Sequence, residues 1–243
     1  MWTNAGNLLV GESGSGGLRI ENGGKVTDSY GYLGRNAGAT GEATVTGAAS
    51  SWTNTGDLEV GASGAGTLTV ENGGSVSAGT LWAAPQDLVG NGTINATGLV
   101  ADMDLVFDAL DATRGAQQTL AFGTGGALNL KVDGSGGLGD RSSLGVGFNN
   151  AGTLSVGNGA KVTSLYGYLG FGFGTGSSGS ATVTGTGSRW TNSDGLTVGN
   201  YGSGTLMIEN GGTVSDSSGD IARHSGSTGT VTVTGAGSTW TTT

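Results

Sequence analysis

The residues of this chain that could carry chemistry gather between positions 102 and 114. Asp102 and Asp104 alternate as two residues on one face of a strand do, and Asp108, Asp111 and Arg114 follow. Paired carboxylates on a strand face can exchange protons with a substrate or hold Ca²⁺, and an arginine beside them could stabilise the carbanion of a lyase reaction. The other interpretation, which we favour, is that Asp108 and Asp111 form turns in the segment FDALDATRG and that the remaining carboxylates are solvated.

Other residue types that carry chemistry are scarce. The chain has no cysteine and one histidine, His224, which excludes a zinc site of the usual kind. No G-x-S-x-G segment between a strand and a helix supports a Ser-His-Asp triad, and no GK[ST] sequence follows the glycine-rich segments. We therefore predict a protein that is not an enzyme, with no catalytic or metal-binding residues and no cofactor, and we expect His224 to lie at the surface.

The composition limits the possible partners. Of 243 residues, 54 are glycine, one is proline and 11% are charged. The net charge of −9 argues against binding to nucleic acid or to an anionic membrane surface, because both require a basic patch. No apolar run approaches the ~20 residues of a transmembrane helix, so we expect no direct membrane insertion. The first residues, MWTNAGNLLVG, lack the features of a signal peptide, and we expect a trimmed segment of a longer exported chain.

The sequence repeats itself. Residues 45–74, VTGAASSWTNTGDLEVGASGAGTLTVENGG, return at 183–212 as VTGTGSRWTNSDGLTVGNYGSGTLMIENGG. Trp2 and Trp52 lie 50 residues apart, as do Trp190 and Trp240. Each 50-residue period divides into two related halves, so the elementary period is about 25 residues. Periods of this length are typical of solenoid proteins, so the repeat indicates the fold class.

Each half-period has the pattern of short strands. Triplets such as LRI, LTV, ATV and LMI alternate apolar and polar residues, and glycine-rich turns separate them. Strands this short bury a core only when successive coils stack at the ~4.8 Å strand spacing. The pattern predicts an all-β protein, a right-handed parallel β-helix of about nine or ten coils. We expect a single domain over residues 1–243, with regular coils at 1–78 and 142–243 and irregular coils with longer loops at 79–141.

Stacking assigns structural roles to the residues that recur. Large side chains at matched positions should form columns, and these are Trp2, Val26, Trp52 and Val76 in the first part and Val162, Trp190, Val214 and Trp240 in the last. A packed interior column is the favoured interpretation, and an exposed aromatic ladder that stacks on sugar rings is the alternative. Asn22, Asn72 and Asn210 of the ENGG segments should be turn residues whose amides bond along the coil axis.

The order of these motifs resembles a known family. The segments LxVGxxGxGTLxIENGGxVS, YGYLGxxxGxxGxATVTGxGSxWTNS and GLVADMDLVFD are similar to the repeat of bacterial autotransporter passenger domains and of PEP-CTERM-associated surface proteins. The resemblance covers nearly the whole chain. It implies a β-helical stalk of a Gram-negative bacterium, secreted or held at the cell surface, in a parent chain that carries an outer-membrane translocator barrel. No catalytic motif of that family is carried over.

Three functions follow as hypotheses. The first is a non-enzymatic passenger or stalk module for adhesion or surface display, which binds glycans or surface proteins through many weak contacts. The second is a carbohydrate-active enzyme or glycan-binding module with its site in region 79–141, at Asp102, Asp104, Asp108 and Arg114. The third is a surface-matching protein that presents ranks of threonine to ice or to a crystalline polymer. Open coil ends would also expose strand edges, so end-to-end self-association is expected of a trimmed segment.

Overall fold

The chain forms a parallel β-solenoid, as the repeat predicts. A computed structural model describes residues 1–115, 118–122, 126–128, 142–172 and 176–243. The protein is all-β, with stacked parallel coils that make about nine turns spaced about 25 residues apart. The predicted fold class is therefore confirmed. By contacts the chain divides into two compact units, Met1–Thr97 with Thr119–Lys131 and Gly98–Gln118 with Val132–Thr243. Each unit is described by itself, and the expectation of a single domain stays a prediction.

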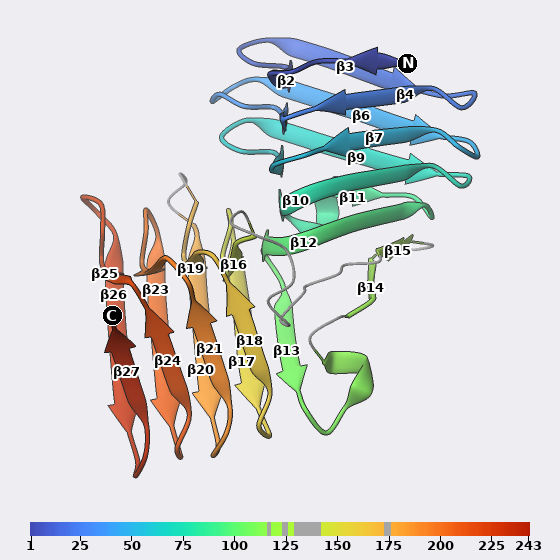
Figure 1. Ribbon diagram of the computed structural model, residues 1–243. Helices are drawn as coiled ribbons and strands as arrows, with labels where there is room; N and C mark the ends of the chain where they lie inside the picture. The colour runs from blue at the N-terminus through green and yellow to red at the C-terminus, as the bar shows by residue number, and fades with distance from the viewer. Residues whose placement is uncertain (116–117, 123–125, 129–141, 173–175) are drawn as a thin grey trace. The chain divides into compact units, whose positions relative to one another are not determined.

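Unit 1 has three strand positions in each coil, and strands at one position pair in parallel with their counterparts (Figure 1). The first position holds β1 (Trp2–Thr3), β4 (Lys25–Asp28), β7 (Ser51–Asn54) and β10 (Ser75–Ala83). The second holds β2 (Asn7–Val10), β5 (Tyr30–Leu33) and β8 (Leu58–Val60), and the end of β10 continues it. The third holds β3 (Ser15–Ile20), β6 (Thr40–Thr46), β9 (Ala65–Glu71) and β11 (Leu88–Val89).

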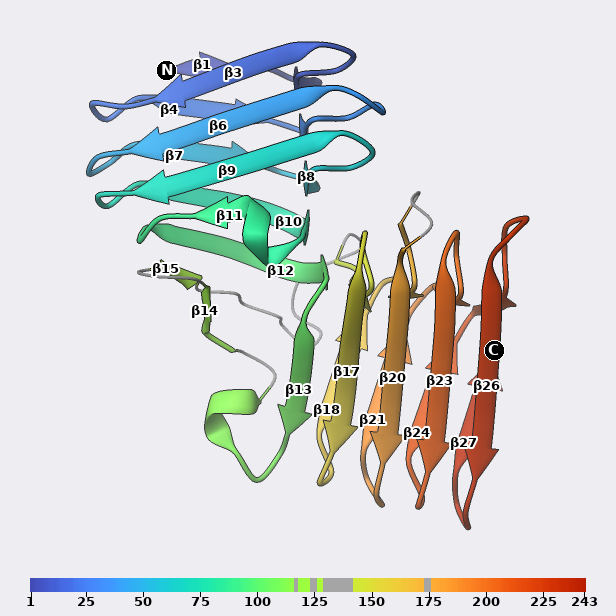
Figure 2. The same ribbon diagram turned by 180° about the vertical axis from the view of Figure 1, so that it is seen from behind.

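Unit 2 repeats this arrangement (Figure 2). One parallel series runs from the end of β12 (Thr93–Ala101) through β16 (Leu144–Val146), β19 (Gly167–Leu169), β22 (Gly195–Val198) and β25 (Ser218–Ile221). A second comprises β13 (Asp104–Asp108), β17 (Ala151–Gly157), β20 (Ser178–Thr184), β23 (Ser203–Glu209) and β26 (Thr228–Thr234). The third comprises β18 (Lys161–Ser164), β21 (Arg189–Asn192), β24 (Thr213–Asp216) and β27 (Thr239–Thr242).

The core lies inside each coil, where the apolar members of the alternating triplets point. In β9, Leu68 and Val70 are buried while Thr67 and Thr69 face outward. Each inward residue lies beside its counterpart one coil away, as Val45 does beside Val70. Burial of about 25 cal/mol per Å² of apolar surface in such ladders, summed over the coils, supplies the main stabilisation.

Trp52 and Trp190 are buried in the interior of their units. Both have no exposed surface, and Val26, Val76, Val162 and Val214 are their register partners. The structure thus corresponds to an interior column, and an exposed aromatic ladder does not exist at these two positions. Trp2, in the first coil, is 49% exposed and pairs with Val26. Trp240 lies in the last strand and pairs with Val214.

The space for each indole comes from a glycine on the neighbouring strand series. A Cβ on Gly31 would lie 2.8 Å from the Trp52 ring, and one on Gly167 would lie 2.8 Å from the Trp190 ring. The YGYLG segments supply these glycines between two half-buried tyrosines. Both tyrosines of each segment lie on the outer face, because residues two apart on a strand share a face.

The ENGG asparagines adopt the left-handed backbone that their turns need. Asn22, Asn72 and Asn210 have φ values of 54°, 51° and 53°. The side-chain amide of Asn72 donates to Thr46 Oγ1 at 3.2 Å, and that of Asn210 donates to Thr184 Oγ1 at 3.2 Å. These bonds join successive coils, so Asn72 and Asn210 serve both the turn and the stack.

The irregular region departs from the coil pattern around the single proline. Pro85 begins a short 3₁₀ helix, η1 (Pro85–Asp87), and β14 (Leu120–Phe122) pairs antiparallel with β15 (Gly126–Leu128). A second 3₁₀ helix, η2 (Ala112–Arg114), follows β13. Residues 129–141 of this predicted region lie outside the described residues. In the part of the chain that the structure describes, no helix has the length and hydrophobicity needed to cross a membrane.

Candidate functional site

The acidic residues of the candidate site lie along β13 and the turns at its two ends, all in unit 2. Asp102 precedes the strand, Asp104 and Asp108 are its first and last residues, and Asp111 is the N-cap of η2. Asp104 and Asp108 are four residues apart on a strand, hence about 13 Å along it. That separation exceeds the roughly 5–9.5 Å between the paired carboxyl groups of glycosidases.

Asp102 and Asp104 bind the coil that follows. Asp102 accepts hydrogen bonds from the backbone N–H of Asn149 at 2.9 Å and from the side-chain amide of Asn150 at 3.1 Å. Asp104 accepts a hydrogen bond from Thr153 Oγ1 at 2.5 Å, and these two residues are register partners. Both carboxylates therefore act as acceptors for the β16–β17 turn and for β17.

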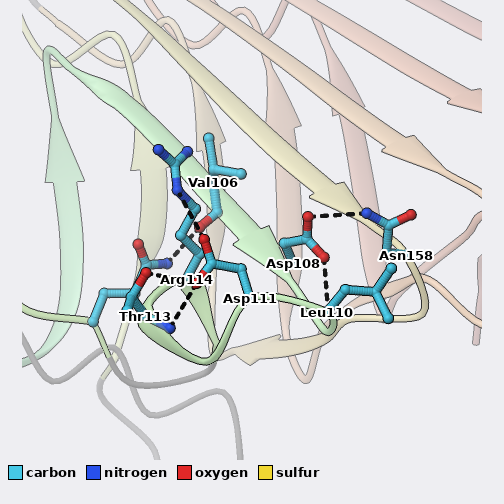
Figure 3. Close-up of polar contacts among 8 residues, drawn as sticks. Val106, Asp108, Leu110, Asp111, Thr113, Arg114 and Asn158 are labelled. Carbon is cyan, nitrogen blue, oxygen red and sulfur yellow. Dashed lines mark hydrogen bonds and ion pairs between the residues drawn. The ribbon is translucent and has the colours of Figure 1, made fainter.

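Asp108, Asp111 and Arg114 form the turn after β13 (Figure 3). Asp108 accepts hydrogen bonds from Leu110 N at 2.8 Å and from the Asn158 amide at 2.9 Å. Asp111 caps η2 by accepting from Thr113 N at 2.9 Å, and hydrogen bonds from the Thr113 side chain and backbone lower the pKa of its carboxyl. The turn prediction for these two aspartates agrees with this geometry.

Arg114 faces Asp111 and not the other carboxylates. Its Nε lies 3.6 Å from Asp111 Oδ2, and within the described ranges this is its one salt bridge. Both side chains are about half exposed, so the pair contributes little to stability. Among the described residues, no ion pair joins Arg114 to Asp102 or Asp104, the residues beside which the lyase hypothesis places it. Across the described residues, moreover, no three His, Asp or Glu side chains gather closely enough to hold a metal ion.

His224 lies in the turn after β25. Its ring stacks on the ring of Tyr201 from the preceding coil, with centroids 3.9 Å apart and an angle of 1° between the planes. The half-buried histidine thus has a structural role in the stack of turns, in keeping with the expected surface position.

Comparison with known proteins provides no relative. No protein family matches the chain, and no curated protein or solved structure is significantly similar to it.

Two titratable residues of unit 1 have unusual surroundings that the motif search missed. Burial raises the pKa of Asp28 to about 6, although a hydrogen bond from Trp52 lowers it. Burial, and then the charge of Asp57, raise the pKa of Glu59 to about 7, while Arg35 lowers it. Comparison of the repeats could have pointed to these two carboxyls. The positions of unit 2 that match Asp28 and Glu59 hold the hydroxyl residues Ser164 and Thr197.

Proposed function

We propose that this chain is a non-enzymatic β-helical module of a secreted or cell-surface protein, a stalk or passenger segment for adhesion or surface display. The observation that carries the proposal is the use of the polar side chains of β13. Asp102, Asp104 and Asp108 each accept hydrogen bonds from the neighbouring coil, and Asp111 caps a turn. Carboxylates that bond to the next coil and cap a turn support a structural role for this segment.

A regular outer face supports binding through repeated weak contacts. In unit 2, outward hydroxyl residues follow one another from coil to coil at one register position, namely Thr153, Ser180, Thr205 and Thr230. The neighbouring outward position holds Ser155, Thr182, Met207 and Thr232. Such rows recur at the ~4.8 Å strand spacing and offer many equivalent, uncharged hydrogen-bonding groups. Glycans or proteins on another surface are the partners that this chemistry fits.

The same rows give the surface-matching hypothesis its specific support. Ice or a crystalline polymer requires an unbroken rank of hydroxyls, and the row at Thr153 meets that requirement. The adjacent row does not, since Met207 interrupts it. Adhesion through many weak contacts tolerates such an interruption, so it is the function we favour.

The export route rests on the sequence resemblance alone. An autotransporter or PEP-CTERM-type parent protein would place this module at the surface of a Gram-negative cell, joined to a translocator barrel. Cell fractionation of the native host with an antibody to this chain tests this route.

Binding to glycan arrays and to purified surface proteins tests the proposal. We expect weak binding of the free chain that strengthens when the chain is displayed densely on beads. The double variant Thr205→Val and Thr230→Val should weaken the binding of the bead-displayed chain several-fold. Thr241→Val, which removes a hydroxyl from β27 on a different strand series, serves as the control. Release of sugar ends from any polysaccharide would overturn the non-enzymatic assignment, and an array without any binding would contradict adhesion.

A further inference from the structure

Asp28 occupies a buried polar position beside Trp52. The residue is 1% exposed, and its Oδ2 accepts a hydrogen bond from Trp52 Nε1 at 2.6 Å. Its register partner on β7 is Asn54, which is 3% exposed. The other oxygen of Asp28, Oδ1, and the amide oxygen of Asn54 have no hydrogen-bond partner among the described residues. Buried acceptors without donors cost free energy, so this pair of oxygens needs an explanation.

The matched position in unit 2 shows what is missing. There Ser164 Oγ accepts from Trp190 Nε1 at 3.1 Å and donates its own proton to Asn192 Oδ1 at 2.8 Å. A hydroxyl can fill both roles because it is a donor and an acceptor. A carboxylate cannot, but a protonated carboxyl can, with Oδ2 accepting from the tryptophan and an O–H on Oδ1 donating to Asn54.

A third version of this site needs no proton on its carboxyl. Asp216 accepts a hydrogen bond from Trp240 Nε1, and its second oxygen accepts from Thr242 Oγ1 at 2.9 Å. Both partners of Asp216 are donors, as an ionised carboxylate requires. The contrast with Asn54, which presents an oxygen, is what assigns a proton to Asp28.

Glu59 is a second carboxyl of unit 1, half-buried beside two aromatic side chains. Its register partners are Tyr32 on β5 and Trp82 on β10, and Trp82 is 5% exposed. No salt bridge joins Glu59 to another described residue, although Arg35 lies 4.7 Å over the Tyr32 ring. In unit 2 the same position holds Thr197, which is 3% exposed. The fold therefore does not require a carboxyl at this position.

The charged groups around each carboxyl are few. Asp28 lies against Trp52 and Asn54 of β7, which are both uncharged. Around Glu59 stand Asp57 of its own turn, Arg35 and Tyr32 from the β5 side, and Trp82 from β10. The charge of Asp57 opposes ionisation of Glu59, and that of Arg35 favours it.

We propose that Asp28 and Glu59 hold protons in folded unit 1 at mildly acidic pH, and that their ionisation as the pH rises through neutrality loosens unit 1 but not unit 2. At the repeat-matched positions of unit 2 stand the hydroxyl residues Ser164 and Thr197, and the aspartate at an equivalent position of unit 2, Asp216, has donors for both of its oxygens. Unit 1 is thus an acid-stabilised stack, in which buried Asp28 completes its hydrogen bonding to Trp52 and Asn54 only when neutral, and half-buried Glu59 lies between Tyr32 and Trp82.

The direction of the pH effect follows from the proton balance. The pKa of Asp28 is raised from 3.8 to about 6, and that of Glu59 is raised from 4.5 to about 7. The folded state binds these protons more tightly than the unfolded state does, so their stabilisation is complete below about pH 4 and is lost as the pH rises through 6 and 7. Each group should change the unfolding equilibrium constant by roughly tenfold to a hundredfold between pH 4 and pH 8.

Neutral replacements provide the test. Asp28→Asn presents an N–H where the protonated carboxyl has its O–H, and Glu59→Gln is isosteric. We expect each variant to match the wild-type chain in thermal unfolding at pH 4.5 and to be more stable at pH 8. Asp28→Ser and Glu59→Thr import the residues of unit 2 and should have the same effect if the amide variants fold poorly. Glu42→Gln, at an exposed position on β6, is the control.

Local readouts separate this proposal from a general effect of charge. Hydrogen exchange of peptides from β5, β8 and β10, corrected for intrinsic rates, should accelerate between pH 5 and pH 8 in the wild-type chain and not in the double variant Asp28→Asn, Glu59→Gln. Peptides from β19, β21 and β22 should not change. Infrared difference spectra at pH 5.5 should lose a protonated-carboxyl band on Asp28→Asn. Identical pH profiles of variants and wild type would overturn the proposal, as would the absence of that band.

Discussion

At the scale of single residues, the fold depends on glycines that admit the tryptophans. A Cβ on Gly31 would lie 2.4 Å from Asn54 Oδ1 and 2.8 Å from both Leu58 and Trp52. We therefore expect Gly31→Ala to destabilise the protein by about 1–3 kcal/mol through overpacking. Urea unfolding monitored by tryptophan fluorescence measures this. Gly17→Ala is the matched control because nothing lies within 4 Å of the added methyl group, and equal losses for the two variants would contradict the explanation.

Part of the residue-scale picture was accessible from the sequence and part was not. The register of Val26, Trp52 and Val76 follows from spacing, since stacking places residues of equal phase side by side. The role of Gly31 does not, because the glycine meets Trp52 across the coil interior from another strand series. Nor does the protonation of Asp28, which depends on which atom of Asn54 faces it.

At the scale of elements, the acidic residues of β13 and its turns form hydrogen bonds to the next coil and within the turns. Asp102 accepts two hydrogen bonds from the β16–β17 turn, so Asp102→Ala should cost about 1–3 kcal/mol. Arg114→Ala should cost less than Asp102→Ala, because its salt bridge with Asp111 is long and exposed. Chemical denaturation of the variants checks this order. A larger loss for Arg114→Ala would indicate a role for the arginine that these contacts do not explain.

The sequence could not predict the hydrogen-bond partners of these aspartates, because the partners lie far away along the chain. Asn149, Thr153 and Asn158 lie 47 to 50 residues from the aspartates that they contact. The regular repeat is interrupted between them, so no constant offset predicts these pairs. Local chemistry, in contrast, was readable: Asp108 and Asp111 bond to backbone N–H groups two residues ahead, as turn-forming aspartates do.

At the scale of the whole molecule, the 50-residue period and the 25-residue period predict different outcomes when coils are added. Tryptophan and valine alternate in the column, with Val26 between Trp2 and Trp52. A tandem copy of residues 3–52, a full 50-residue period, keeps this alternation and the glycine that accommodates each indole. Duplication of one coil of about 25 residues instead places two residues of the same kind against each other.

We expect the longer duplication to fold with a larger m-value in urea, because stability and buried surface grow with the number of coils. The shorter duplication should be less stable than the parent chain. If both inserts were tolerated equally, the alternation of tryptophan and valine would not be what fixes the order of the coils, and the two kinds of half-period would be interchangeable.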